Sequence, residues 1–535
     1  MNKFNKTSII FTILILCLTL QLFSFNGWQT GVHEGTHGLQ FRRIETSQDV
    51  EVRRGSADAS HIIIPENVNI QGTIWTVIEI AFQGFFNFTT MTYITIPNSM
   101  IHIGNWAFEG CTGLTSITIP NSVTRIGGGA FLGCTGMTSI VIPCSVTQIR
   151  FNPFSYCINL ESITVAEENA HYRSEYNSVI RNSDNTLIIG TKNSIISDNV
   201  ISIGEWAFRG TKGLTSITIP NNVLTIGREA FSGCSGLIKI IIPNNVTIIG
   251  DFAFSGCIGL TSVDFEAPSG LTNIGRSVFR GCIGLTEIAI PNSVINIGDW
   301  AFEGCISLTE IIIPNRVISI GDGAFEGCIG LISVEFESPS NVTHFGDRTF
   351  LDCTGLIDIT IPDSVTTIGS AAFRGCTDLT SIIIPISVID IGEGVFRDCP
   401  ELTIYAKAPS KPIGWHENWN PDDRPVNWGH IVSEVDKIES VCTTVLMGNF
   451  PNPFNPYTSI RYKVSGIGDQ FVEIEIYNIR GQRVRSLVNE YMHTGEHKAI
   501  WNGKNDNGMP VSSGVYFYRF SSGDYTETRR MLLMK

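Results

Sequence analysis

The chain has 535 residues, of which 43% are hydrophobic and 16% are charged. It is too long for one globular core and too apolar for general disorder, so domains or repeats are expected. The formal net charge of −14 excludes nucleic acid and an anionic membrane as main partners, because both require a cationic face. A neutral or cationic partner is expected instead.

Residues 1–26 have the pattern of a secretory signal peptide. Lys3 and Lys6 precede an apolar run from Ile9 to Phe23. This run is shorter than the roughly 20 apolar residues that a spanning helix needs, and no later segment approaches that length. The mature chain is therefore expected not to span a membrane. An uncleaved N-terminal anchor is the alternative.

Residues 27–64 alternate apolar and polar residues irregularly and are expected to cap a repeat that runs from residue 65 to 430. The period is mostly 23 residues, which is typical of a solenoid whose units bury their apolar faces only by stacking. Phenylalanine marks each predicted coil, at Phe82, Phe108, Phe131, Phe154, Phe208, Phe231, Phe254, Phe279, Phe302, Phe325, Phe350, Phe373 and Phe396.

One unit shows how the pattern works. Leu114, Ile117 and Ile119 are expected to point inward from a short strand, because they alternate with polar residues. Pro120 ends the strand, since proline lacks an N–H, and Gly127 permits a turn that a side chain would obstruct. The predicted fold is mainly β: a solenoid with a parallel sheet along one face.

The Ile-Pro, Ser-Val, Ile-Gly, Ala-Phe and Gly-Cys elements of these units resemble the BspA-like leucine-rich-repeat family. The resemblance covers roughly Gly38 to Gly429 and implies a surface-exposed or secreted interaction protein. Residues 167–198 depart from the period. Their segments Tyr172–Ile180 and Asn185–Ile189 predict a hairpin insertion, which family members often carry.

Most cysteines occupy one position of the repeat, three residues after the phenylalanine. There a thiol is expected to act as a small buried apolar group, with Phe85 and Thr211 in its place in two coils. Disulfides between stacked neighbours are the alternative. The cysteines at this position are Cys111, Cys134, Cys157, Cys234, Cys257, Cys282, Cys305, Cys328, Cys353, Cys376 and Cys399.

Outward strand positions change along the repeat from hydroxyl side chains to carboxylates. These carboxylates are predicted to form one acidic strip on the sheet face, which would attract a cationic partner or a divalent ion. A solvated face that keeps the sheet soluble is the alternative. The residues of the predicted strip are Asp264, Glu266, Glu287, Glu310, Glu335, Glu337 and Asp358.

Catalytic motifs are missing from the sequence. It contains no HExxH, GxSxG or GxxxxGK[ST] pattern, and no Cys/His cluster with zinc-like spacing. His102 and His344 lie inside repeats, where a solvated or core histidine is expected. The stretch from Asn505 to Gly508 favours a tight turn over a calcium loop. We therefore predict no catalytic residue, no metal, no cofactor and no enzyme activity.

Two further segments complete the chain. Residues 402–430 are expected to cap the solenoid with Trp415, Trp419 and Trp428, for which a carbohydrate platform is the alternative. A linker, residues 431–448, leads to residues 449–535. These predict a small antiparallel sandwich, from strand-like stretches separated by turn signals at Arg480-Gly481, Asn507-Gly508 and Ser522-Gly523.

The C-terminal segment looks like the sorting domain of type IX secretion cargo and the immunoglobulin-like module of flagellar hook-capping proteins. The matching elements are Asn-Pro-Phe-Asn-Pro, Ile476-Tyr477-Asn478, Trp501-Asn502-Gly503 and the terminal Met-Leu-Leu-Met-Lys. The resemblance implies passage across an outer membrane by the secretion machinery. The predicted function is adhesion or binding of an extracellular or surface protein. A polysaccharide-binding or polysaccharide-degrading accessory protein and a structural envelope component are the alternatives.

Overall fold

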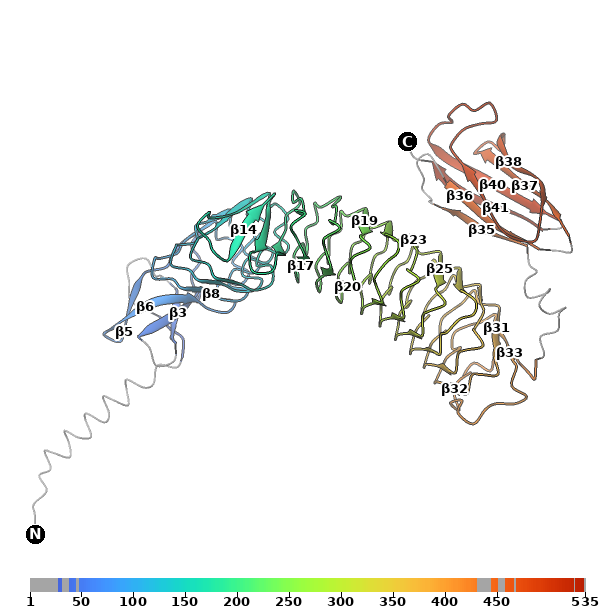
Figure 1. The fold of residues 1–535 in the computed structure, drawn as a ribbon, viewed down its shortest axis with the longest axis horizontal. Coiled ribbons are helices and arrows are strands. Elements are labelled where there is room, and N and C mark those ends of the chain that lie inside the picture. Colours follow the sequence, from blue (N-terminus) through green and yellow to red (C-terminus); the bar gives the residue numbers. More distant parts are fainter. Residues whose placement is uncertain are drawn as a thin grey trace, which may run out of the picture. The chain divides into compact units, whose positions relative to one another are not determined.

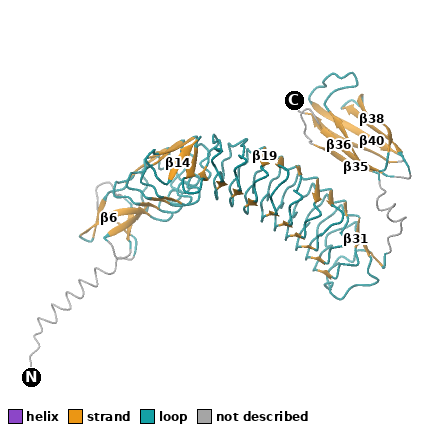
Figure 2. Ribbon diagram, in the orientation of Figure 1, coloured by secondary structure: helices purple, strands orange, loops and turns teal. Residues whose placement is uncertain are grey.

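The computed structural model describes residues 27–30, 38–44, 48–430, 444–450, 458–465, 468–523 and 525–533. The predicted signal peptide and most of the predicted linker lie outside these residues. Within them, regular structure consists of strands joined by turns, without a helix (Figure 2). Two compact units are present, one formed by residues 1–405 and 411–426, the other by residues 406–410 and 427–535. Each is described by itself.

The solenoid unit begins with strands that extend its sheet. β2 pairs antiparallel with β1 and β3, and β3 then runs parallel to the longer β6, whose other neighbours are β5 and the first short repeat strand, β8. The bounds are β1 (Gln29–Thr30), β2 (Gln40–Arg43), β3 (Asp49–Arg53), β5 (Asn67–Ile70), β6 (Thr73–Ile80) and β8 (His102–Ile103).

Most coils then contribute two short strands, and the coils stack side by side (Figure 1). The first strand column comprises β4 (His61–Ile63), β7 (Tyr93–Thr95), β9 (Ser116–Ile117), β11 (Ser139–Ile142), β13 (Ser162–Val165), β19 (Lys239–Ile242), β21 (Ser262–Phe265), β23 (Glu287–Ile288), β25 (Glu310–Ile313), β27 (Ser333–Phe336), β29 (Asp358–Ile359), β31 (Ser381–Ile384) and β33 (Thr403–Ala406). The second strand column continues from β8 through β10 (Arg125–Ile126), β12 (Gln148–Ile149), β17 (Ser202–Ile203), β18 (Thr225–Ile226), β20 (Ile248–Ile249), β22 (Asn273–Ile274), β24 (Asn296–Ile297), β26 (Ser319–Ile320), β28 (His344–Phe345), β30 (Thr367–Ile368) and β32 (Asp390–Ile391). β34 (Val426–Trp428) follows the last coil. Each column is divided into several sheets, and the strands that pair within a column run parallel, as the periodicity predicts.

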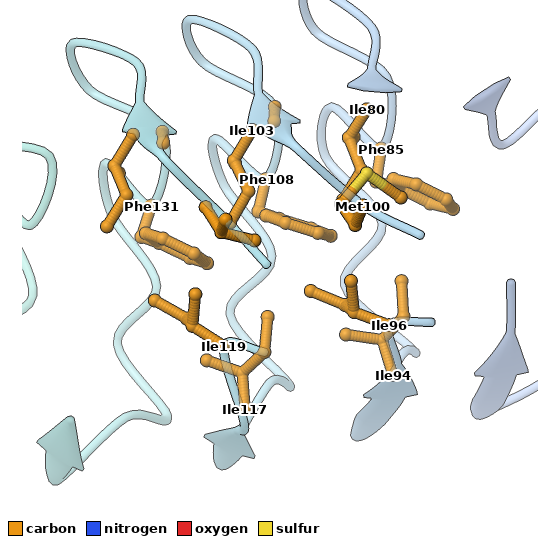
Figure 3. Close-up of a cluster of buried hydrophobic side chains, with 14 of the residues drawn as sticks. Ile80, Phe85, Ile94, Ile96, Met100, Ile103, Phe108, Ile117, Ile119 and Phe131 are labelled. Carbon is orange, nitrogen blue, oxygen red and sulfur yellow. The ribbon is translucent and has the colours of Figure 1, made fainter. Parts of the chain in front are cut away.

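A stack of phenylalanine rings fills the interior between the two columns. Rings of successive coils lie 5.0–5.8 Å apart between centroids and within 17° of parallel. Figure 3 shows Phe85, Phe108 and Phe131 in this arrangement, with isoleucines from the strands around them. Because each fully buried apolar side chain contributes roughly 1.5–3 kcal/mol, the ring stack and its isoleucines dominate the stability of the solenoid.

The marker of the first coil is Phe85, and the prediction of Phe82 is wrong. Phe82 is 60% exposed, whereas Phe85 is fully buried and stacks on Phe108. The backbone N–H of Phe85 donates to the carbonyl of Ala107 one coil later, as that of Phe108 donates to Ala130. The first coil therefore has the same spacing as most of the others. In this coil Phe88, which is buried as well, takes the place of the cysteine.

Two glycine positions are required for different reasons. A Cβ on Gly127 would lie 2.4 Å from the backbone nitrogen of Asn105 in the preceding coil, so close stacking excludes a side chain there. Gly133 has a φ of 71°, and a Cβ on it would meet no atom nearer than 3.9 Å, so its requirement is conformational.

We expect Gly127→Ala to destabilise the solenoid by about 2–3 kcal/mol, since backbone has to move, and Gly133→Ala by about 1 kcal/mol, the left-handed penalty of an L-residue. Guanidinium unfolding of the full chain measures both. A larger loss for Gly133→Ala than for Gly127→Ala would contradict this interpretation.

The insertion is a three-stranded meander and not the predicted two-stranded hairpin. β14 (Tyr172–Glu175) pairs antiparallel with β15 (Ser178–Arg181), which pairs antiparallel with β16 (Thr186–Ile189). The additional turn lies at Tyr176 and Asn177, both with positive φ. β16 then pairs in parallel with β17, so the insertion ends inside the second strand column.

The C-terminal module consists of two antiparallel sheets around a separate core, as predicted. Its largest fully buried side chains are Trp501, Tyr462 and Tyr518. One sheet has the order β35-β36-β39 and the other β38-β37-β40-β41. The bounds are β35 (Val445–Phe450), β36 (Thr458–Val464), β37 (Gln470–Asn478), β38 (Arg483–Met492), β39 (Gly495–Trp501), β40 (Gly514–Ser522) and β41 (Tyr525–Leu533).

The predicted turn from Asn505 to Gly508 closes around the side chain of Asn505. Its carbonyl oxygen accepts the backbone N–H groups of Asn507 and Met509, and the backbone N–H of Gly508 donates to the backbone carbonyl of Asn505. The carboxylate of Asp506 accepts the N–H of Ser486. These contacts account for the Asn-Asp-Asn-Gly pattern as local backbone hydrogen bonding.

Candidate binding surface

The predicted acidic residues lie on the outward face of the first strand column, but in two rows. Ser262 pairs with Glu287, and Val263 with Ile288. Asp264 is therefore two positions further along its strand than Glu287. The coil after Phe254 is longer than the usual repeat, and its additional residues lie beyond the strand, so equal spacing along the sequence does not give equal register.

The same offset recurs in the next long coil. Glu310 pairs with Ser333, and Ser333 pairs with Asp358, which puts Glu335 in the row of Asp264. One row thus contains Glu287, Glu310 and Asp358, and the other contains Asp264 and Glu335. The predicted single strip is corrected to two rows, interrupted by serine and isoleucine.

Three of the predicted residues differ from the others in their surroundings. Asp264 forms an ion pair with Lys239, 2.5 Å away on the preceding coil, which neutralises it. Glu337 accepts the backbone N–H of Asn315 at 3.1 Å and so helps to hold two coils together. Glu266 follows the strand end and is exposed. Besides Asp264, the predicted residues that are exposed on the strands themselves are Glu287, Glu335 and Asp358.

Isoleucines share this face with the carboxylates. Ile241 pairs with Asp264 and is 47% exposed, and Ile312 pairs with Glu335 and is 48% exposed. Side chains alternate between the two faces of a strand, so these isoleucines point outward. The prediction of the acidic strip considered only charged residues and therefore left them out. The surface is therefore both anionic and apolar, which suits a partner with cationic and apolar side chains.

Two of the three tryptophans of the predicted C-terminal cap are buried, whereas Trp428 is 37% exposed. Trp415 and Trp419 are 3% and 6% exposed and contact each other at 4.7 Å between ring centroids. The indole N–H of Trp415 donates to the carbonyl of Val388, and Trp419 stands edge-on to Phe396, the last ring of the stack. They cover the end of the core, as expected of a cap.

A hollow of about 410 Å³ lies beside the insertion, lined by Thr147, Ala170, His171, Tyr172, Arg181, Asn182 and Ser183. The hydroxyl of Tyr172 accepts the backbone N–H of Ile149 at 2.9 Å. Burial raises the pKa of Tyr172. Arg181 is held by Asp184 at 2.8 Å. The hollow presents hydrogen-bonding groups of both kinds and suits a small polar ligand.

The two repeat histidines lie in the second strand column. His102 pairs with Arg125, and burial, followed by the charge of Arg125, lowers the pKa of its imidazole. His344 pairs with Thr367. In the described ranges, His, Cys, Asp and Glu side chains form no group of three that would hold a metal ion. The same residues contain no apolar helix of membrane-spanning length.

Comparisons with known proteins identify both units. A model described as "BspA type Leucine rich repeat region" matches residues 60–182, 188–294 and 272–403 in six copies. A model described as "Secretion system C-terminal sorting domain" matches residues 449–534. No curated protein matches.

The chain is also similar to solved structures of bacterial proteins. One is a leucine rich cell surface protein from Faecalibacterium prausnitzii A2-165, with 27% identity over 73% of this chain and 97% of the other, and a TM-score of 0.46. Another is a leucine-rich repeat protein from Bacteroides ovatus ATCC 8483, with 25% identity over 73% and 98%, and a TM-score of 0.42.

The sorting domain implies an interaction with a secretion machinery and a location outside the cell or on its outer surface. The repeat model matches more than half of the residues. The chain therefore belongs to the BspA-type leucine-rich-repeat family and carries a C-terminal secretion sorting domain.

Proposed function

We propose that this exported protein is a binding or adhesion protein whose first strand column takes a cationic, partly apolar segment of an extracellular or surface protein. The proposal is supported by one observation above all: exposed carboxylates and the exposed Ile241 and Ile312 share the outward face of β19 to β29. Both matched families are non-catalytic kinds of module, and we infer that the protein is not an enzyme.

Electrostatics favour this surface as the contact. Glu287 begins β23 and is exposed, and Asp358 and Glu335 are exposed on later strands of the same column. Cationic side chains of the partner pair with these carboxylates, and an apolar side chain covers Ile312. Charge then provides orientation and association rate, while the apolar contact contributes most of the affinity.

Neutralising four carboxylates tests the proposal. In the full chain, Glu287→Gln, Glu310→Gln, Glu335→Gln and Asp358→Asn together are expected to weaken binding of an alternating lysine-isoleucine peptide about tenfold at low ionic strength. Added salt should weaken binding to the unchanged protein and hardly affect the variant, because salt screens exposed charges. Isothermal titration calorimetry measures the affinities.

The control variant removes equal charge elsewhere. Glu168, Glu205, Glu393 and Glu417 are exposed and lie outside the first strand column. Their joint replacement by glutamine should leave the affinity unchanged. Equal losses in the two variants, or equal binding of an alternating glutamate-isoleucine peptide, would count against this surface as the contact.

The hollow beside the insertion supports a second candidate function, binding of a small saccharide. The ring nitrogens of His171, the amide of Asn182 and the hydroxyl of Ser183 line it and suit sugar hydroxyls. A glycan array probed with the full chain and with Asn182→Ala tests it. Binding that survives unchanged in the variant, or an array without signal, removes this candidate.

A further inference from the structure

The repeat cysteines form a column of buried thiols through the solenoid. All eleven are at most 7% exposed, and all are free. A protein that is exported meets oxidising surroundings, in which closely stacked thiols ordinarily form disulfides. A structural feature that keeps these thiols reduced is therefore needed.

Every thiol of the column is engaged in the same hydrogen bond. Its S–H donates to the carbonyl oxygen of the marker phenylalanine in the preceding coil, over 3.0–3.3 Å in all eleven cases. In nine of the eleven cases that oxygen also accepts the backbone N–H of the cysteine in its own coil, and in the coils of Phe85 and Phe208 it accepts the N–H of Phe88 and of Thr211. The carbonyl of Phe302, for example, accepts the N–H of Cys305 and the S–H of Cys328. The thiol thus completes the hydrogen bonding of a buried carbonyl.

This hydrogen bond and burial both act against the reactive form. The thiolate is the species that alkylates or forms disulfides. Burial raises the pKa of Cys157, Cys257 and Cys328 to about 12, from an ordinary value of 9.0. Loss of the proton would also leave a thiolate facing a carbonyl oxygen without a hydrogen between them. A disulfide between neighbouring coils would remove two donors from two buried carbonyls.

We propose that the exported protein retains the column as eleven free thiols, and that each becomes reactive only when its own coil opens. The inference concerns a property of the solenoid itself and does not depend on which ligand the surface binds.

Differential alkylation of the full chain, purified under air, tests the proposal. Native protein is treated with iodoacetamide, whose carbon forms an S–C bond with the thiolate while iodide leaves and the thiol proton passes to the buffer. Denaturation and a heavier iodoacetamide then label the remainder, and peptide mass spectrometry reads each cysteine. Cys144 lies outside the column and is only partly buried, so it serves as the internal reference.

The column is expected to take the first label at least tenfold more slowly than Cys144, because a buried, hydrogen-bonded thiol meets the reagent only when its coil opens. All eleven should take the second label without prior reduction. Column peptides joined by disulfides, carrying oxidised sulfur, or labelled as fast as Cys144 would overturn the proposal.

A variant tests the opening of single coils. Phe302→Ala removes the ring beside Cys305 and is expected to accelerate the first labelling of Cys305 and Cys328 at least tenfold, because repeats communicate chiefly with their neighbours. Cys111 and Cys134, many coils away, should keep their protection. Equal acceleration of all eleven would show global opening and would overturn the coil-by-coil part of the proposal.

Discussion

Replacement of Phe302 by alanine is expected to lower the free energy of unfolding of the solenoid by about 4 kcal/mol. The ring is fully buried and lies 5.5 Å from that of Phe279 and 5.3 Å from that of Phe325. Its removal costs the transfer of an aromatic side chain and leaves a cavity between two rigid coils, which cannot collapse without losing their strand pairing. Guanidinium unfolding followed by circular dichroism measures the loss.

The matched control is Phe82→Ala, which removes the same side chain from the surface. Phe82 is 60% exposed and touches Trp106 edge-on, so at most about 1 kcal/mol should be lost. Phe85→Ala should resemble Phe302→Ala, because Phe85 is the buried ring of the first coil. If Phe82→Ala proved as damaging as Phe302→Ala, the register assigned to the first coil would be incorrect.

The incorrect prediction of Phe82 shows that a short sequence match does not fix the register of an atypical coil. Ala81-Phe82 copies the dipeptide Ala130-Phe131, and this likeness of two letters suggests the wrong marker. The structure follows a different criterion, the translation that brings the backbone N–H of a marker phenylalanine onto a carbonyl of the next coil. Only Phe85, one full period before Phe108, meets it. The repeat length and the buried positions were predictable because they recur in every coil. The register of a single atypical coil is set by its hydrogen bonds to the next coil.

The arrangement of the carboxylates on the candidate surface likewise depends on the register between neighbouring strands. Strand alternation correctly predicts that Glu287 and Glu335 point outward. Their separation into two rows follows from the longer coils, and the sequence does not reveal on which side of the strand the additional residues lie. The neutralisation of Asp264 by Lys239 depends on that cross-coil pairing, so it too required the structure.

In the C-terminal module the sequence pattern predicts neither β35, whose residues Val445 to Gly448 fall in the predicted linker, nor β38. The ten residues of β38 are exposed or half-buried throughout, so the apolar alternation that identifies β37 and β40 is missing. β38 exists because it pairs with β37 along nearly its whole length, from Gln470 opposite Met492 to Tyr477 opposite Arg483. An edge strand of this kind is determined mainly by pairing with its neighbour, because it makes few apolar contacts of its own.

The largest effect in the C-terminal module is expected from Glu475, on β37. This carboxylate is 5% exposed and lies between two guanidinium groups, those of Arg483 at 3.1 Å and Arg519 at 2.6 Å, with the hydroxyl of Tyr477 also donating to it. Glu475→Ala removes the shared acceptor of these donors, of which the two arginines are about half exposed to water, and is expected to cost the module about 1–2 kcal/mol. Glu473→Gln, two residues earlier on the same strand, should cost less than about 1 kcal/mol. Hydrogen exchange of β37 and β40 in the full chain measures both.

The same carboxylate predicts a pH dependence whose sign follows from its environment. Burial alone would raise the pKa of Glu475, but the hydrogen bonds from Tyr477, Arg483 and Arg519 outweigh it and lower the pKa below the ordinary 4.5. In the unfolded chain the group therefore takes up its proton at higher pH than in the folded module. The stabilisation is complete above the ordinary pKa and is lost as the pH falls from there through the lowered value. Glu475→Gln should abolish this acid-induced loss, and calorimetric unfolding at decreasing pH measures it. An equally steep loss in the variant would show that other carboxylates cause the acid sensitivity.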